Sequence, residues 1–206
     1  MSARSFKLCY ITDRLTLGSR PLAGTIQSAI SAGIDLIQIR EKDLDTRPLF
    51  ELAQAAAASV PGTATHVLVN DRLDVALTAG AHGVHLAGQS MPVEHVRAVV
   101  PPGFQVGVSC HSVEGVRASE RAGADYALLG PIFETASKLR YGPPLGLAVL
   151  ERAARQVRRM PVLALGGINV ERVPACLAAG AAGVAGISIF QQCDSLEERV
   201  SALRAL

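Results

Sequence analysis

The chain has no tryptophan and few aromatic residues of any kind. Aromatic residues make up 4% of its 206 residues, whereas 49% are hydrophobic. A core built from this composition has to be aliphatic, and such cores suit parallel strands that are buried on both faces. A chain of this length is able to bury a sizeable core, so we expect a single domain over residues 1–206.

Strong charge and long apolar runs are lacking as well. The net charge is only +2, with basic and acidic residues interspersed, which argues against a nucleic-acid-binding stripe or a polybasic membrane anchor. No apolar run reaches the roughly 18–20 residues that span a bilayer, and the apolar stretch after Lys7 is too short for a signal peptide. We therefore expect no nucleic-acid partner and no membrane association. The oligomeric state stays open, and a homo-oligomer is compatible with the sequence.

Cysteine is scarce and has no CxxC spacing. The four cysteines lie far apart in the chain, at Cys9, Cys110, Cys176 and Cys193. This distribution favours reduced thiols in a cytoplasmic protein over a disulfide framework or a zinc site.

Short β-type runs alternate with helical, alanine-rich stretches along the whole chain. We expect eight strands: Leu8–Thr12, Leu36–Arg40, His66–Asn70, Gly83–Leu86, Gln105–Cys110, Tyr126–Gly130, Val162–Gly166 and Gly183–Ser188. Alternating βα units force parallel strands with helical crossovers. Eight units in about 200 residues predict a compact (β/α)8 TIM barrel near the lower size limit of that fold.

An Ala-Gly pair before every second predicted strand supports this count. The pairs end at Gly33, Gly80, Gly123 and Gly180, and glycine suits the left-handed position just past a helix end. The alternative fold is an open doubly wound sheet. No GxGxxG follows the first strand, so a dinucleotide fingerprint is absent.

In a (β/α)8 barrel the active site lies at the C-terminal ends of the strands. The sixth predicted strand leads into a loop of at least residues 131–143 that carries Thr135, Ser137 and Lys138. Hydroxyl and ammonium groups at a strand end can donate hydrogen bonds to a phosphate, and a loop this long indicates a lid or a binding loop. The alternative is a plain solvated loop with a surface lysine.

The second and third predicted strands also end in polar residues. If the extended run continues, alternation points Gln38, Arg40 and Lys42 the same way, which would suit a pyrophosphate or another polyanion. Alternatively, Arg40 and Glu41 could belong to an internal ring of ion pairs. Asp71, at the end of the third strand, could bind Mg²⁺, orient a nucleophile or cap the next helix.

The remaining strand ends supply histidines, glycines and serines. His85 and His111 are possible acid–base groups, or packed and capping residues. Neither has neighbours at metal-ligand spacing, so no zinc site is predicted. Gly167 and Ser188 follow the seventh and eighth strands, where barrels of this type often bind phosphate. The alternative is a tight turn that needs glycine.

Together these pieces resemble the thiamin phosphate synthase family, including its TenI-type thiazole tautomerase branch. The resemblance runs from about Leu8 to Ser188 and rests on the order and spacing of these motifs: Gln38-Ile39-Arg40-Glu41-Lys42, Val69-Asn70-Asp71-Arg72, Gly83-Val84-His85-Leu86, Asp125-Tyr126, Gly130-Pro131-Ile132-Phe133 with Thr135, Ser137 and Lys138, Gly166-Gly167-Ile168, and Gly183-Val184-Ala185 with Ile187-Ser188.

The resemblance implies an enzyme that joins hydroxymethylpyrimidine pyrophosphate to thiazole phosphate and releases pyrophosphate. It implies a pyrimidine and pyrophosphate set of Gln38, Arg40, Lys42, Asn70, Ser109 and Lys138. It implies thiazole contacts from Thr135 and Ser137, and a phosphate cradle of Gly167, Ile187 and Ser188. Asp71 resembles the family's Mg²⁺ ligand.

The chain departs from the synthase pattern at two places. Ser90 stands where the family supplies a second metal-binding Asp, and a neutral hydroxyl is a weak Mg²⁺ ligand. Leu139 replaces a second basic residue of the loop, with Arg140 next to it. The tautomerase branch tolerates loss of the metal site but can carry a His where this chain has Pro131, for which His111 is a replacement candidate. A thiazole tautomerase and a noncatalytic phosphate-binding barrel therefore remain the alternatives to the synthase.

Overall fold

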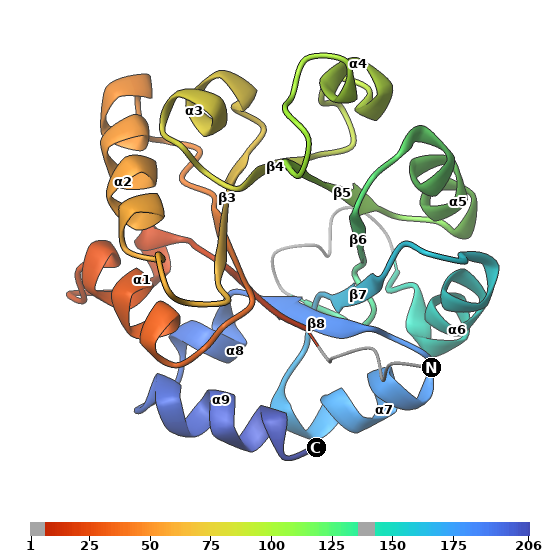
Figure 1. The fold of residues 1–206 in the computed structure, drawn as a ribbon. Helices are drawn as coiled ribbons and strands as arrows, with labels where there is room; N and C mark the ends of the chain where they lie inside the picture. The colour runs from red at the N-terminus through yellow and green to blue at the C-terminus, as the bar shows by residue number, and fades with distance from the viewer. Residues whose placement is uncertain (1–6, 136–142) are drawn as a thin grey trace.

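The strands of the computed structural model, which describes residues 7–135 and 143–206, close into a barrel in sequence order (Figure 1). All neighbouring strands are parallel, and β1 closes the barrel by pairing with β8. The strands are β1 (Lys7–Ile11), β2 (Leu36–Ile39), β3 (His66–Asn70), β4 (Gly83–Leu86), β5 (Gln105–Cys110), β6 (Tyr126–Leu129), β7 (Val162–Leu165) and β8 (Gly183–Gly186). The predicted (β/α)8 barrel is confirmed, and the open sheet is wrong.

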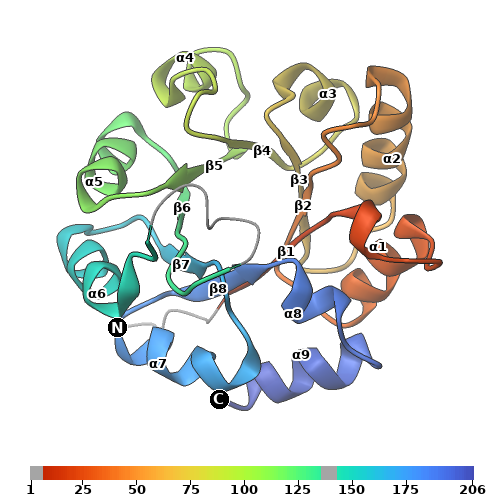
Figure 2. The same cartoon turned by 180° about the vertical axis from the view of Figure 1, so that it is seen from behind.

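Helices surround the barrel on its outside, as both views show (Figures 1 and 2). They are η1 (Arg14–Thr16), α1 (Leu22–Ser31), α2 (Thr46–Ala58), α3 (Leu73–Thr78), α4 (Val93–Arg97), α5 (Val113–Ala122), α6 (Gly146–Gln156), η3 (Val170–Arg172), α7 (Val173–Ala178), α8 (Ser188–Gln191) and α9 (Leu196–Arg204). No helix in the described ranges is long and apolar enough to cross a membrane.

Buried aliphatic side chains form two layers, one on each side of the strands. The larger layer lies between strands and helices, where residues such as Val67, Val69 and Val106 pack against the helical shell. The smaller layer fills the barrel interior and consists of Cys9, Ile11, Leu36, Leu68, Tyr126, Leu128, Leu163 and Ala185. Because alternate residues of a strand face opposite sides, β1, β2, β3, β6, β7 and β8 contribute to both layers, which explains their near-continuous hydrophobic sequences. The apolar residues of β4 and β5 all belong to the larger layer.

The Ala-Gly pairs act as helix terminators, as predicted. Gly33, Gly80, Gly123 and Gly180 all have positive φ, between 68° and 91°, which is the left-handed region that glycine enters without a Cβ penalty. All four cysteines are unpaired thiols, also as predicted.

Five predicted strands extend one or two residues too far. β1, β2, β6 and β7 each end one residue early, at Ile11, Ile39, Leu129 and Leu165, and β8 ends two residues early, at Gly186. Gly166 has a φ of 95°, which leaves the extended region, and Ser188 already begins α8. The residues past these strand ends are therefore loop residues, and the loops carry the polar groups described next.

Candidate active site at the C-terminal rim

The described candidate residues all lie at or just beyond the C-terminal ends of strands, as the barrel rule predicts. They come from six strands: Gln38, Arg40 and Lys42 from β2, Asn70 and Asp71 from β3, Ser109 and His111 from β5, Thr135 from β6, Gly167 from β7, and Ile187 and Ser188 from β8. Ser137 and Lys138 lie outside the described residues.

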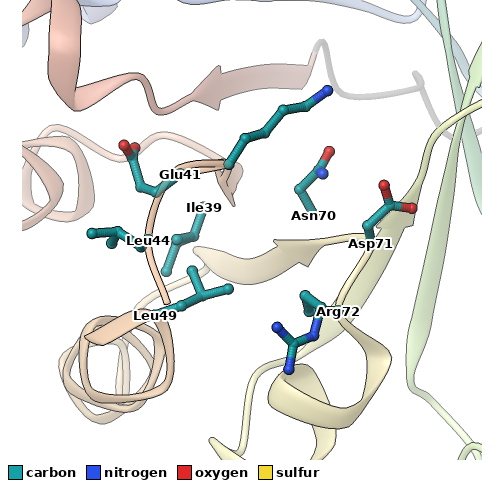
Figure 3. A pocket seen from close by; sticks show the side chains of 8 residues that line it. Ile39, Glu41, Leu44, Leu49, Asn70, Asp71 and Arg72 are labelled. Carbon is teal, nitrogen blue, oxygen red and sulfur yellow. The ribbon is translucent and has the colours of Figure 1, made fainter. Parts of the chain in front are cut away.

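A pocket of about 290 Å³ opens between the loops that follow β2 and β3. Leu44 and Leu49 lie on its α2 side and Asn70, Asp71 and Arg72 on its β3 side (Figure 3). Ile39, Glu41 and Lys42 complete its lining. The pocket therefore combines an apolar wall with amide, carboxylate and cationic groups.

Gln38 and Asn70 are joined by a hydrogen bond at the base of this region. Gln38 is 2% exposed, and its Nε2 donates to Asn70 Oδ1 over 2.9 Å. Gln38 Oε1 is buried and has no hydrogen-bond partner among the residues that the structure describes. Since buried polar atoms normally have a partner, this carbonyl oxygen is suited to a donor supplied by a ligand.

The cations after β2 are arranged differently from the predicted alternation. The strand ends at Ile39 and Lys42 lies in a turn, so the extended run that would align Gln38, Arg40 and Lys42 stops short. Lys42 still reaches the pocket lining. The Arg40 guanidinium forms no ion pair within residues 7–135 and 143–206, so its charge is not already neutralised by a described carboxylate.

The Glu41 carboxylate contacts the loop that follows β1. Its carboxylate is buried and accepts hydrogen bonds from Thr12 Oγ1 at 2.5 Å and from the Arg14 amide at 3.0 Å. Burial raises the pKa of Glu41, although the bonds from Thr12 and Arg14 oppose that effect. Of the two residues of the predicted ion-pair ring, Glu41 is in an ion pair, with its Oε2 3.9 Å from Arg14 Nε, whereas Arg40 takes no part in one within the described ranges. Glu41 thus fastens the loop after β1.

Asp71 occupies a strained position beside Ser90. It is the one non-glycine residue with positive φ in the described ranges, at 62°, a conformation that costs free energy and often marks functional sites. The capping alternative is wrong, because Arg72 holds the N-cap position of α3 and makes no side-chain cap bond. Instead, the Asp71 carboxylate accepts a hydrogen bond from Ser90 Oγ.

Asp71 and Ser90 together offer few ligands for a metal ion. The described part of the chain contains no group of three or more His, Cys, Asp or Glu side chains that could hold a metal ion. Ser90 does lie against Asp71, so the resemblance placed the two loops correctly. One carboxylate and one hydroxyl oxygen fit a hard cation only if water and substrate supply its other ligands.

His85 is a packed residue and not an exposed acid–base group. It is 1% exposed; its Nδ1 lies 3.0 Å from Tyr126 Oη and its Nε2 lies 2.9 Å from Ser109 Oγ. Burial lowers its pKa to about 3; nearby Asp71 opposes this shift and Arg40 adds to it. His85 is therefore neutral at physiological pH and holds Ser109 in place.

His111 lies at the exposed rim just past β5. Its Nδ1 contacts the backbone carbonyl oxygen of Gly130, the residue before Pro131. Because a carbonyl oxygen only accepts, Nδ1 donates this hydrogen bond, and Nε2 has no hydrogen-bond partner within the described ranges. His111 is thus placed beside the position where a tautomerase-type histidine would stand.

The glycine loop after β7 packs tightly against the loop after β6. Gly167 has a φ of 64°, and a Cβ there would lie 2.6 Å from Glu134 O and 2.9 Å from Phe133 Cβ. Arg172 strengthens this contact, since its Nη1 donates to Gly167 O over 2.6 Å and its guanidinium lies 4.7 Å from the Phe133 ring centroid. Glycine is therefore required here for close backbone approach.

The sequence did not predict the roles of three residues near the site. Gly107 and Tyr126, the partner of His85, lie inside the barrel below the rim, and Arg172 lies at the rim itself. A glycine in the middle of a buried strand is a signal of close approach, and Gly107 carries it. Arg172 gave no signal, because an arginine after a loop is usually a solvated surface residue.

The comparisons with known proteins agree with one another. A family model described as thiamine monophosphate synthase matches residues 8–190. A relative from Geobacter sulfurreducens is 42% identical over 206 residues, which cover all of this chain and 96% of that one. Thiamine-phosphate synthase of Clostridium novyi is 36% identical over 193 residues, or 94% of each chain. The solved structure of thiamine phosphate pyrophosphorylase from Pyrococcus furiosus superposes with a TM-score of 0.87 at 31% identity, covering 98% of this chain and 96% of that one.

Proposed function

Because the chain belongs to the thiamine monophosphate synthase family, we propose that it is a thiamin-forming transferase acting in the cytoplasm. It joins hydroxymethylpyrimidine pyrophosphate to thiazole phosphate. The bond between the pyrimidine methylene carbon and the pyrophosphate oxygen breaks, a bond from that carbon to the thiazole nitrogen forms, and pyrophosphate leaves. The observation that carries this proposal is the unpartnered Gln38 carbonyl oxygen beside a pocket lined by Lys42, Asn70 and Asp71.

The pyrimidine ring fits the amide pair at the base of the site. Gln38 Oε1 lacks a donor, and the amino group of the pyrimidine supplies one. Asn70 Oδ1 is already occupied by Gln38 Nε2, so the Asn70 amide nitrogen is left to donate to a ring nitrogen or a phosphate oxygen. This pairing would favour an aminopyrimidine over a ring without an amino group, because the buried carbonyl would otherwise stay unpaired.

The pyrophosphate fits the cations above the amide pair. Charge grows on the leaving oxygens as the carbon–oxygen bond breaks, so fixed positive groups that stabilise this charge accelerate the reaction. Arg40 and Lys42 supply two such groups, and we assign Lys138 the same role. The electron-rich aminopyrimidine stabilises the carbocation that remains, so the reaction requires no protein nucleophile.

Mg²⁺ is the metal that this donor set fits, through Asp71 with Ser90 beside it. When bound, Mg²⁺ would neutralise charge on the pyrophosphate oxygens. It keeps several waters and is commonly held by one or two carboxylates together with substrate phosphates, so a single carboxylate is compatible with it. The chain's own part is to hold the Asp71 carboxylate at the rim, with the Ser90 hydroxyl fixing its orientation.

The thiazole phosphate is assigned to the opposite side of the rim. Gly167, Ile187 and Ser188 would cradle its phosphate, and Thr135 and Ser137 would contact the ring. The support is the position of these loops after β7 and β8, where barrels of this fold commonly bind phosphate.

A second candidate function is isomerisation of a thiazole carboxylate phosphate, and one observation favours it. His111 lies against Gly130 with its Nε2 available, next to the position where the tautomerase branch can carry a histidine. An imidazole at this place could exchange a proton with the thiazole.

An assay with each substrate omitted in turn separates the candidates. The synthase produces thiamin phosphate only when both substrates are present. The tautomerase converts the thiazole carboxylate phosphate with no pyrimidine added and is indifferent to chelator. Ligand binding without turnover in either assay would leave a noncatalytic barrel and contradict the proposal.

A further inference from the structure

A buried chain of three side chains runs across strands β4, β5 and β6. His85 is at its centre, with Tyr126 Oη 3.0 Å from Nδ1 and Ser109 Oγ 2.9 Å from Nε2. His85 and Tyr126 are 1% and 3% exposed, whereas Ser109 is partly exposed at the rim. The chain therefore connects the barrel interior with the site.

Gly107 provides the space that this arrangement needs. The strand register places His85 beside Gly107 and Gly107 beside Tyr126. A Cβ on Gly107 would lie 2.1 Å from Tyr126 Cζ and 2.3 Å from its hydroxyl oxygen. The tyrosine ring thus crosses the β5 backbone at a position where a side chain is excluded, and in this way its hydroxyl reaches His85 from two strands away.

The direction of the hydrogen bonds follows from the tyrosine hydroxyl. The buried Tyr126 O–H needs an acceptor, and His85 Nδ1 is the partner found for it in the described ranges. Nδ1 therefore accepts, so the proton of the neutral imidazole is on Nε2. The Nε2–H donates to Ser109 Oγ, so the hydroxyl proton of Ser109 points away from His85 and is available to another acceptor. The opposite direction would bury the tyrosine proton without an acceptor.

The hydroxyl groups of Ser90 and Ser109 consequently offer opposite hydrogen-bonding roles to the site: Ser90 offers an acceptor and Ser109 offers a donor. Ser90 donates its proton to Asp71, so the outward side of its oxygen carries lone pairs that suit a cation. Ser109 accepts a proton from His85, so its own proton is directed outward and suits an anion.

We propose that Tyr126 and His85 are positioning residues that fix Ser109 as a hydrogen-bond donor to an anionic group of the substrate. On the proposed function, that group is the pyrophosphate of the pyrimidine substrate. Tyr126 and His85 touch no substrate and act only through the Ser109 hydroxyl.

The first test reads the tautomer of His85 in the ligand-free, metal-free chain and does not depend on catalysis. ¹⁵N NMR, with the signal assigned by its loss in His85→Gln, should show a protonated Nε2 and an unprotonated Nδ1. In Tyr126→Phe this single-tautomer signal should give way to a mixture. A protonated Nδ1 in the wild type would overturn the proposal even if the protein proves to be the proposed synthase.

The second test is a double-mutant cycle on the KM of the two substrates. Ser109→Ala and Tyr126→Phe should each raise the KM for the pyrimidine pyrophosphate by about tenfold, and the double variant should be no worse than Ser109→Ala alone. The KM for thiazole phosphate should stay unchanged. Multiplicative effects in the double variant, or equal effects on both substrates, would show a merely structural role.

Three further variants distinguish the positioning role from a loss of folding. Tyr10→Phe removes another buried tyrosine hydroxyl, which is bonded to Gln191, and should leave both KM values unchanged. His85→Gln keeps an amide that can accept from Tyr126 and donate to Ser109, and should stay within about threefold of wild type. His85→Leu should match Ser109→Ala. Equal loss in His85→Gln and His85→Leu would contradict a donor role. If the chain turns over neither substrate, the NMR test alone decides the tautomer.

Discussion

Ser90 donates a hydrogen bond to the Asp71 carboxylate across the loops that follow two neighbouring strands. The sequence position where the family supplies a second metal-binding carboxylate is therefore also adjacent to Asp71 in space. A serine there leaves Asp71 as the principal charged ligand for Mg²⁺ in the proposed site.

Changing these two residues should have opposite effects on metal dependence. Ser90→Asp places a second carboxylate next to the first; the two repel without a cation, so the Mg²⁺ concentration for half-maximal rate should fall by roughly tenfold. Asp71→Asn should reduce turnover by about 100-fold or more. Rates measured against Mg²⁺ concentration check both, with Ser90→Ala as the control that adds no charge. Identical Mg²⁺ curves for Ser90→Asp and Ser90→Ala would contradict the assignment.

A side chain at Gly167 should displace the loop after β6. A Cβ would lie 2.6 Å from Glu134 O, so Gly167→Val should raise the KM for thiazole phosphate and lower the free energy of unfolding by roughly 1–3 kcal/mol. Gly62→Val is the matched control, because Gly62 also has positive φ, at 83°, but nothing lies within 4 Å of its Cβ position. Gly62→Val should destabilise through backbone strain alone and leave KM unchanged. Equal KM values for the two variants would show that the close contact at Gly167 does not shape the site.

Acid should destabilise the fold through His85. Its pKa is about 3 in the folded chain, against an ordinary value of 6.5, so the unfolded state binds the proton first as the pH falls. The contribution of His85 to the free energy of unfolding is complete above pH 6.5. It declines by about 1.4 kcal/mol per pH unit as the pH falls from 6.5 toward 3. The groups that act on it are neutral Tyr126 and Ser109 and the charges of Asp71 and Arg40.

Urea unfolding with chelator at pH 7, 6 and 5 measures this contribution. The free energy of unfolding of the wild type should fall more steeply with acid than that of His85→Gln, which has no group titrating in this range at that position. Parallel pH profiles for the two proteins would mean that folding does not lower the pKa of His85.

Local sequence pattern was sufficient for the strands but not for the contacts between them. Gln105–Cys110 is a buried run with turn signals on both sides, and its bounds are the same in the structure. In contrast, alternation failed after Ile39 because the chain turns at Lys42. The partners of Glu41, which are Thr12 and Arg14 from the loop after β1, depend on how two neighbouring strand ends meet.

The same limit applies to the candidate site. The barrel rule predicts that Asn70, Ser109 and Gly167 share a rim, because strand ends alone decide it. The chain from Tyr126 through His85 to Ser109 requires the strand register and the absence of a side chain at Gly107. These hydrogen bonds join residues that are far apart in the sequence, so the periodicity of hydrophobic residues along a single sequence does not predict them.

The most direct test compares pyrophosphate release by Arg40→Met and by Arg117→Met at saturating Mg²⁺ and thiazole phosphate, with the concentration of the pyrimidine pyrophosphate varied. Arg117 is an exposed residue of α5 and serves as a charge-matched control. The account predicts that Arg40→Met lowers kcat/KM for the pyrimidine pyrophosphate by roughly 100-fold or more, with pyrophosphate and thiamin phosphate formed one to one by the wild type, and that Arg117→Met equals the wild type. Undiminished release by Arg40→Met, or no release by correctly folded wild-type protein, would contradict it.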